Sequence, residues 1–258
     1  MNTMQLNRLF SWFDRYVEPF LATDEEGKKN IQLKIEHTKK VCEAMALLSE
    51  GEGLSENESN IAAAVALLHD VGRFPQYRKW RTFRDSDSDN HARLAIEVIR
   101  EENILDGVDL NEHILIEEAI RFHNLFEPPA TFKSFTRKYI EMIRDADKLD
   151  IWRVFVELLA QKPEERASAA LLDLKDLPEA VSDLCVAALD SGNIVKLDTT
   201  TCINDFKLLQ ISWVYDLTCK TSRRILLERG YITSLASSLP ERSDIRQAVI
   251  KALNSLSA

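Results

Sequence analysis

The sequence predicts an all-α protein, and three observations support that fold class. Glycine is rare, with 7 among 258 residues, and the hairpin dipeptide Asn-Gly does not occur. Apolar residues instead recur three and four positions apart through most of the chain, which is the spacing of amphipathic helices. The length allows a sizeable core in one domain, or one domain with an extension.

Local signals place the individual helices. The first helix should carry one apolar face made of Leu6, Leu9, Phe10, Phe13 and Val17. Capping-box patterns begin at Thr23, Ser55 and Asp109 and should open three further helices, and Asp89 could cap another. Pro128-Pro129 should end the region that follows the helix opened by Asp109, and should force a loop there. A long helix through Asp147 should follow that loop.

Charge and cysteine usage narrow the functional classes. The net charge of −9 argues against a general nucleic-acid or anionic-membrane surface, although a local basic site could still bind a nucleotide. The longest apolar run is far short of the ~20 residues that span a bilayer. The four cysteines are widely spaced and indicate neither a disulfide framework nor a zinc motif. Because charged residues interrupt the aromatic N-terminal segment, we expect no signal peptide and a cytoplasmic protein.

The most informative feature is His69-Asp70, which closes the apolar run IAAAVALLHDVG. A buried His and Asp are costly unless something compensates them, and a metal ion is a common compensation. Further candidate ligands lie on the apolar faces of four other expected helices: His37, His91, His123 and Asp147. A single inward histidine is more often a satisfied core residue. Four of the five histidines in this pattern, together with two aspartates, favour a metal site.

Helical phase also separates the neighbours of these candidates. Asp145 lies about 200° around the helix from Asp147, so we expect only Asp147 to point inward strongly. Asp150 lies about 60° from Asp147 and could orient a ligand by hydrogen bonding. His113 lies about 80° from the His123 direction and is interpreted as structural or exposed.

The order His, His-Asp, His, His, Asp resembles the HD superfamily of metal-dependent phosphohydrolases. HDVGR is similar to the family's His-Asp-hydrophobic-Gly-Lys/Arg segment, HTKKV to its first histidine segment and DADKLD to its last. The resemblance covers roughly residues 28–160. It implies an HD-domain helical bundle over residues 28–160, preceded by an N-terminal helix over 1–27 and followed by a helical C-terminal extension over 161–258. We expect these parts to form one continuous globular unit.

The resemblance also implies the metal arrangement. One ion would be bound by His37, His69, Asp70 and Asp147, and a second by His91 and His123 with Asp70 shared as the catalytic bridge. The sequence leaves open whether one or two ions bind. Four imidazoles favour a divalent transition metal, Mn, Fe, Co, Ni or Zn, over Mg, which prefers oxygen ligands.

A basic and aromatic segment between His69-Asp70 and His91 is the candidate substrate-binding loop. Arg forks pair with phosphate oxygens, and aromatic rings stack on bases. Arg73, which directly follows His-Asp-Val-Gly, is the strongest candidate, and related enzymes often place a phosphate-contacting Lys there. The other candidates are Arg78, Arg81 and Arg84 in the segment and Lys34, one turn before His37. The alternative is a solvated loop that its aromatic residues anchor to the core.

The leading functional hypothesis is a metal-dependent phosphohydrolase, a phosphomonoesterase or phosphodiesterase, acting on a nucleotide or another small phosphate ester through a water activated by two metals. The same ligands occur in HD-fold diiron oxygenases that cleave C–C or C–P bonds, which is the first alternative. The second alternative is a non-catalytic nucleotide-binding regulator. We expect a small-molecule partner, no stable nucleic-acid binding and no membrane association. The sequence leaves homo-oligomer formation open.

Overall fold

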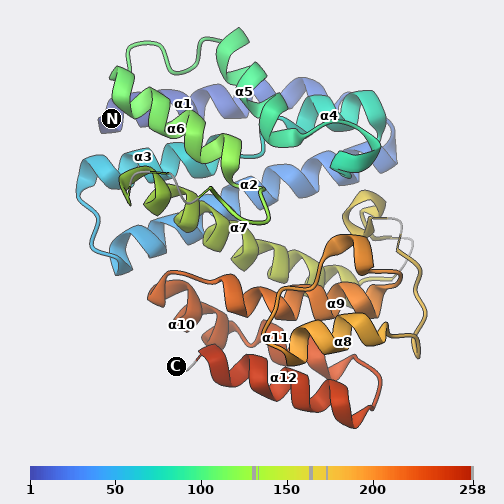
Figure 1. Ribbon diagram of the computed structural model, residues 1–258. Helices are drawn as coiled ribbons and strands as arrows, with labels where there is room; N and C mark the ends of the chain where they lie inside the picture. The colour runs from blue at the N-terminus through green and yellow to red at the C-terminus, as the bar shows by residue number, and fades with distance from the viewer. Residues whose placement is uncertain (130–131, 133, 163–164, 173, 257–258) are drawn as a thin grey trace. The chain divides into compact units, whose positions relative to one another are not determined.

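The computed structural model describes residues 1–129, 132, 134–162, 165–172 and 174–256, and within these residues it is built from helices (Figure 1). The single β pairing in this part of the chain is an isolated bridge between Lys175 and Cys202. The all-α prediction is therefore confirmed. None of the described helices combines the length and apolar composition that crossing a bilayer requires.

The chain separates into two compact units, one formed by residues 1–150 and 164–172 and the other by residues 151–163 and 173–258. The helices of the first unit, here called the N-terminal unit, are α1 (Thr3–Val17), η1 (Glu18–Leu21), α2 (Glu25–Gly51), α3 (Glu56–Leu68), α4 (Arg73–Trp80), η2 (Asp85–Asp87), α5 (His91–Glu101), α6 (Leu110–Phe122), most of α7 (Ser134–Ala160) and η4 (Ser168–Leu171).

The helices of the second unit are shorter and follow the last turns of α7. They are α8 (Asp183–Asp190), η5 (Leu197–Thr199), α9 (Ile203–Ser212), η6 (Trp213–Asp216), α10 (Lys220–Arg229), α11 (Tyr231–Ser237) and α12 (Ser243–Leu256). Within this unit, α9 packs against α8, α11 and α12. The indole of Trp152 donates a hydrogen bond to the carbonyl of Gln210, and its ring lies edge-on to Trp213.

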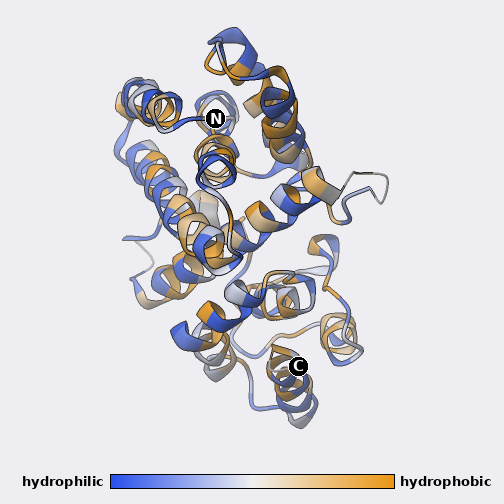
Figure 2. Cartoon of the chain, turned by 90° about the vertical axis from the view of Figure 1, so that its left-hand side faces the viewer, coloured by the Kyte–Doolittle hydropathy of each residue, from blue (hydrophilic) through white to orange (hydrophobic). Residues whose placement is uncertain are grey.

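The core of the N-terminal unit forms around α3. This helix packs against α1, α2 and α6, and its residues from Ala64 to Leu68 are fully buried. Leu9, Phe13 and Val17 form the buried side of α1, and Figure 2 shows hydrophobic and hydrophilic residues intermixed along the helices. Burial of α3 on several sides explains its nearly continuous apolar sequence. It also carries the following His69-Asp70 into the interior.

Helix caps follow the expected chemistry but not always the expected residue. Ser55 and Glu58 form the predicted capping box at α3, and Asp109 caps α6. At α2 the cap is Asp24 rather than Thr23, and at α5 it is Asn90 rather than Asp89. In both cases the side-chain oxygen of the following residue accepts the hydrogen bond from a backbone N–H in the first turn of the helix. Asp89 instead pairs with Arg93, one turn into α5.

The expected substrate-binding loop is in part a helix, α4. Pro75 is accommodated because it lies in the first turn, where a backbone N–H has no helical partner. Phe74 and Tyr77 are buried on one face of α4, and the helix ends at Arg81, which has a positive φ of 59°. The loop therefore begins only after α4. The buried Phe74 and Tyr77 anchor the Arg-rich segment to the core, as expected if it is a solvated loop held by its aromatic residues.

Gly72 permits the close approach between α4 and α5. A Cβ atom at this position would lie 2.2 Å from the carbonyl oxygen of His91 and 2.4 Å from the amide nitrogen of Ala95. Both are backbone atoms, which cannot move aside as a flexible side chain would. The glycine after His-Asp-Val is thus required to place the first turn of α5 beside Asp70.

Candidate metal centre

Six side chains from five helices and the residues that directly follow them lie together in the N-terminal unit. His37 lies in the middle of α2, His69 and Asp70 directly follow α3, and His123 directly follows α6. His91 begins α5 and Asp147 lies on α7. The four histidines and Asp70 are buried, and the Asp147 side chain is 22% exposed, so the cluster reaches solvent on the α7 side.

The cluster contains two groups of three candidate ligands. His37, His69 and Asp70 offer atoms that all lie within 4.8 Å of one another, and so do Asp70, His91 and His123. Asp70 is the member that the two groups share. The structure therefore brings together all the residues that the sequence predicted as ligands, and those residues could hold one or two ions.

The two oxygens of Asp70 face different groups. Its Oδ2 lies 3.6 Å from His37 Nε2 and 3.8 Å from His69 Nε2. Its Oδ1 lies 3.6 Å from His91 Nε2. We call the His37–His69 side of Asp70 subsite A and the His91–His123 side subsite B. A carboxylate with one oxygen toward each subsite has the orientation that bridging two ions requires.

Asp147 belongs to subsite A. Its Oδ1 lies 3.0 Å from His37 Nε2 and 3.8 Å from His69 Nε2. Asp145, two residues earlier, is fully buried, whereas the Asp147 side chain is 22% exposed, so the expectation that only Asp147 points strongly inward is wrong. The middle of α7 is buried on several faces, with Ile143, Ala146 and Leu149 inaccessible to solvent, so burial alone does not identify the ligand.

Each histidine is oriented through its Nδ1 atom. His69 Nδ1 lies 2.7 Å from the carbonyl oxygen of Ala66, and His123 Nδ1 lies 2.6 Å from that of Ile120. Both carbonyls come from the preceding turn of the same helix. An N–H at Nδ1 that donates to such an acceptor leaves Nε2 of the neutral ring without a hydrogen and with a lone pair toward the centre.

Carboxylates supply the corresponding contacts for the other two rings. His37 Nδ1 lies 2.7 Å from Asp150 Oδ2, as the sequence predicted for Asp150. His91 Nδ1 lies 2.7 Å from Asp85 Oδ2. Metal-ligating histidines almost always donate their second ring N–H to a carbonyl or carboxylate. All four rings therefore have the environment of metal ligands.

The inward nitrogens have few partners within the protein. The Nε2 atoms of His37 and His69 are buried without a hydrogen bond. The Nε2 atoms of His91 and His123 lie 3.1 Å apart, which places two acceptor lone pairs next to each other. Buried polar atoms normally have partners. An ion in each subsite would supply them, so the residues present fit divalent metals.

Burial and neighbouring charges set the protonation of the cluster. Burial, reinforced by His91 and His69, lowers the pKa of His123 to about 3, and burial together with Arg73 lowers the pKa of His91. Burial and Lys34 act to lower the pKa of His37, but Asp147 and Asp150 outweigh them and raise it. In the absence of metal, His37 thus binds a proton more readily than His91 or His123, and an ion in subsite A would displace that proton.

The two aspartates are ionised. Burial alone would raise the pKa of the Asp70 carboxyl, but the positive charges of Lys34 and Arg73, together with the neighbouring His69, hold it well below its usual range. Burial also acts to raise the pKa of Asp147, and contacts with His37 and His69 lower it. Deprotonated carboxylates are the form that binds metal.

Lys34 and Arg73, two of the predicted substrate-binding residues, lie at the cluster. Lys34 Nζ is 2.8 Å from Asp70 Oδ2. Arg73 Nε is 3.4 Å from Asp70 Oδ1, and its Nη2 is 3.4 Å from His91 Nε2. The Nε–Nη2 edge of the guanidinium therefore faces subsite B.

The other three predicted substrate-binding arginines contact groups outside the cluster. Arg81 forms an ion pair with Asp24 at 2.6 Å. The guanidinium of Arg78 lies 3.7 Å above the ring of Phe20. Arg84 Nη1 is 3.6 Å from Asp87 Oδ2. Substrate binding by these three residues stays a prediction.

Asp85 is not among the residues that the sequence predicts for the site, and neither is Gln76. Asp85 Oδ1 accepts hydrogen bonds from Arg73 and from the amide of Gln76. In the sequence, Asp85 is recognisable only as an acidic residue in the loop before His91. Many surface loops carry such residues, so this feature does not indicate a role at the site. His113, interpreted as structural or exposed, contacts Glu117 at 3.4 Å and is one-third exposed.

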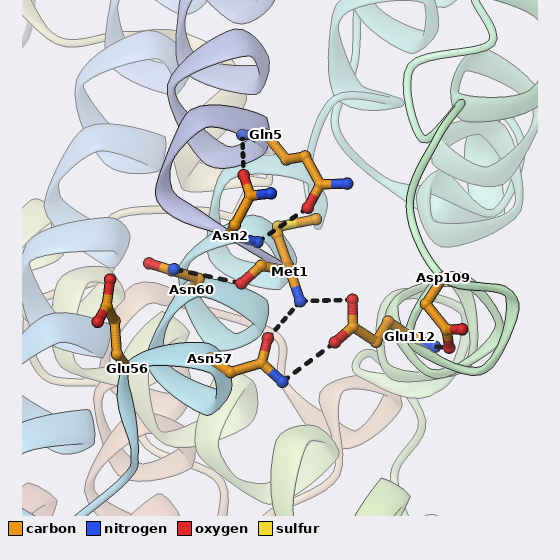
Figure 3. Close-up of a pocket in the computed structure, with 8 residues that line it drawn as sticks. All are labelled: Met1, Asn2, Gln5, Glu56, Asn57, Asn60, Asp109 and Glu112. Carbon is orange, nitrogen blue, oxygen red and sulfur yellow. Dashed lines mark hydrogen bonds and ion pairs between the residues drawn. The ribbon is translucent and has the colours of Figure 1, made fainter.

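A pocket elsewhere in the N-terminal unit differs in chemistry. Figure 3 shows that the amino group of Met1 contacts Asn57 and Glu112 within this pocket, which has a volume of about 480 Å³. Its lining residues are Met1, Asn2, Gln5, Glu56, Asn57, Asn60, Asp109 and Glu112. Carboxylates are the charged side chains of this lining, so an anionic ester is better matched by the His–Asp cluster with Lys34 and Arg73.

Comparison with protein families supports this assignment of the site. A family model described as HD domain matches residues 35–165, which is just over half of the chain and includes all six clustered residues. Comparisons with curated proteins and with solved structures gave no match.

Proposed function

The chain belongs to the HD-domain family, and from that premise we propose that it is a metal-dependent phosphohydrolase whose substrate is a nucleotide or another small phosphate ester. The proposal places ions in subsites A and B, with Asp70 between them as the bridging catalytic residue. His37, His69 and Asp147 complete subsite A, and His91 and His123 complete subsite B. Divalent transition metals, Mn, Fe, Co, Ni or Zn, suit four imidazoles better than Mg does.

One observation supports the proposal most strongly. All four imidazoles direct Nε2 toward a shared ionised carboxylate while their Nδ1 atoms are engaged by carbonyls or carboxylates. When bound there, two divalent ions would lower the pKa of a water and neutralise charge on the phosphoryl group.

The protein's own groups have separate tasks in this scheme. Arg73 Nη1 is anchored by Phe83 O at 2.6 Å and Asp85 Oδ1 at 2.9 Å. The anchor leaves the Nε–Nη2 edge of Arg73 toward the site, where two N–H groups can bind two phosphoryl oxygens. Lys34 offers a second cation on the subsite A side. No nucleophilic side chain is needed, because water is the attacking group.

The test combines metal analysis with a substrate panel. Protein purified without chelator should contain divalent metal, and it should release phosphate, or cleave a phosphodiester, for at least one nucleotide or small ester. Removal of the metal with EDTA should abolish this activity, and Mn²⁺ should restore it. Metal-loaded protein that cleaves no member of a broad panel would contradict the proposal.

The same six residues also fit two iron ions, which keeps a diiron oxygenase as the second candidate. The discriminating outcome is protein that retains iron, consumes O₂ with an organic substrate and releases no phosphate from esters. A protein that binds nucleotide but turns over nothing would instead be a regulator. The complete set of six ligands argues against that third outcome.

A further inference from the structure

Asp85 contacts both a subsite B histidine and the arginine proposed to bind phosphate, on the sides of those residues that face away from Asp70. Its Oδ2 lies 2.7 Å from His91 Nδ1 and accepts a hydrogen bond from the Asn124 amide at 3.3 Å. Its Oδ1 accepts from Arg73 Nη1 at 2.9 Å and from the Gln76 amide at 3.0 Å. Four donors thus converge on one side chain, two at each oxygen.

We propose that Asp85 is a positioning residue that fixes the Nε2 atom of His91 toward subsite B and, at the same time, the phosphate-binding edge of Arg73. This inference rests on the proposed two-metal function and extends it to a residue outside the ligand set. Asp85 itself touches neither ion nor substrate.

The surrounding loop is built to hold Asp85 in place. The Gln76 side chain is fully buried, and its amide also donates to Ser88 Oγ at 2.8 Å and to the Asp89 carbonyl at 2.9 Å. Ser88 Oγ in turn donates to the carbonyl of Arg84. These bonds tie the loop around η2 to α4 and thereby hold the Asp85 carboxylate.

Asp85 is suited to this role because each of its oxygens is an acceptor. His91 must donate from Nδ1 so that Nε2 is free for a metal, and Arg73 always donates. An amide offers one acceptor oxygen and one donor NH₂ group, so it can satisfy one pair of donors and must oppose the other. Asp85→Asn therefore disturbs either His91 or Arg73 at nearly constant volume.

Subsite A provides a matched comparison. Asp150 contacts His37 Nδ1 as Asp85 contacts His91 Nδ1, but Asp85 alone of the two also contacts Arg73. Asp87, two residues from Asp85 in the same loop, is half exposed and lies 3.6 Å from Arg84. Asp87→Asn is the control that changes the same loop charge without touching His91 or Arg73.

The experiment measures Mn²⁺ binding by equilibrium dialysis and electron paramagnetic resonance, and inhibition of ester cleavage by inorganic phosphate. The wild type and Asp87→Asn should bind two ions and show the spectrum of a coupled pair. Asp85→Asn should keep wild-type helical content but bind the second ion about 10- to 100-fold more weakly, show a mononuclear spectrum, and be inhibited less by phosphate. Asp85→Glu, which restores the carboxylate, should recover part of both properties.

Different outcomes test the two proposals separately. A wild-type protein that binds fewer than two ions would overturn the two-metal function and this inference with it. A wild type with two ions and an Asp85→Asn variant with unchanged Mn²⁺ affinity and phosphate inhibition would overturn the role of Asp85 alone. Equal losses in Asp85→Asn and Asp85→Glu would also overturn it, because the carboxylate would then not be the cause.

Discussion

Lys34 and Asp70 form an ion pair inside the histidine cluster, with Nζ 2.8 Å from Oδ2. That oxygen is the one that faces His37 and His69. The lysine side chain is 17% exposed, so its charge is near the surface of the site as well as near the shared carboxylate. A cation in this position stabilises ionised Asp70 and, in the proposed reaction, would also bind an incoming phosphate.

Replacement of Lys34 should separate substrate binding from metal binding. Lys34→Gln removes the charge that we propose binds phosphate, and we expect KM for the best ester to rise about tenfold, the effect of roughly 1.4 kcal/mol. Metal content should remain at the wild-type level, because the lysine competes with cations for Asp70 and does not ligate them. Steady-state kinetics with metal analysis of the same sample checks both points. Loss of both ions in this variant would contradict the role assigned to Lys34.

Asp70 and Asp145 should give opposite patterns of loss. Asp70→Ala removes the carboxylate that both subsites share, so we expect metal binding and activity to disappear while helical content persists. Asp145 is fully buried but belongs to neither ligand group, so Asp145→Asn should lower the melting temperature and keep the metal. Metal analysis, circular dichroism and thermal melting distinguish the two variants. Equal loss of metal in both would overturn the choice of ligand.

Arg73 should contribute to catalysis without contributing to metal content. A charge-assisted hydrogen bond to phosphate is worth roughly 1.5–3 kcal/mol, so Arg73→Ala should lower kcat/KM about ten- to a hundredfold. Arg73→Lys should restore part of that loss, since a point charge replaces the fork. The assay is kcat/KM on the best phosphate ester, with bound metal quantified for each variant. An unchanged kcat/KM in Arg73→Ala would remove this residue from the site.

Acid should destabilise the metal-free protein partly through His123. The folded-state pKa of His123 is about 3, below its usual value of 6.5. Between these values the unfolded chain binds the additional proton, so the free energy of unfolding falls as pH falls below 6.5, by up to about 1.4 kcal/mol per pH unit. His123→Gln lacks this titration and should show a shallower pH dependence. Urea unfolding in EDTA at pH 7 and pH 5 measures the difference, and identical slopes would contradict the pKa assignment.

Much of this architecture could be predicted from the sequence, because the signals are local. Helical periodicity placed His37, His91, His123 and Asp147 on apolar faces, and burial of those faces brings the side chains to one centre. Helical phase also indicated that Asp150 could orient a ligand, and in the structure it contacts His37. The capping box at Ser55 is also a short-range pattern, and it forms as the sequence predicts.

The features that the sequence did not predict depend on tertiary contacts. The segment after Arg73 is helical because Phe74 and Tyr77 pack into the core, and its Arg-rich composition gave no indication of that packing. Asp145 is buried because α7 is covered on several faces. Asp85 acquires its role only when the loop that holds it folds back onto α4 and α5. Its four hydrogen-bond donors come from residues between 12 positions before it and 39 positions after it in the chain.

Anomalous diffraction from crystals soaked in Mn²⁺ tests the central claim most directly. The account predicts two manganese peaks on either side of Asp70, one within about 2.0–2.6 Å of donor atoms of His37, His69 and Asp147, and the other equally close to His91 and His123. Both peaks should be absent in Asp70→Ala. A structure in which the six side chains stay clustered but no manganese binds between them would contradict the account.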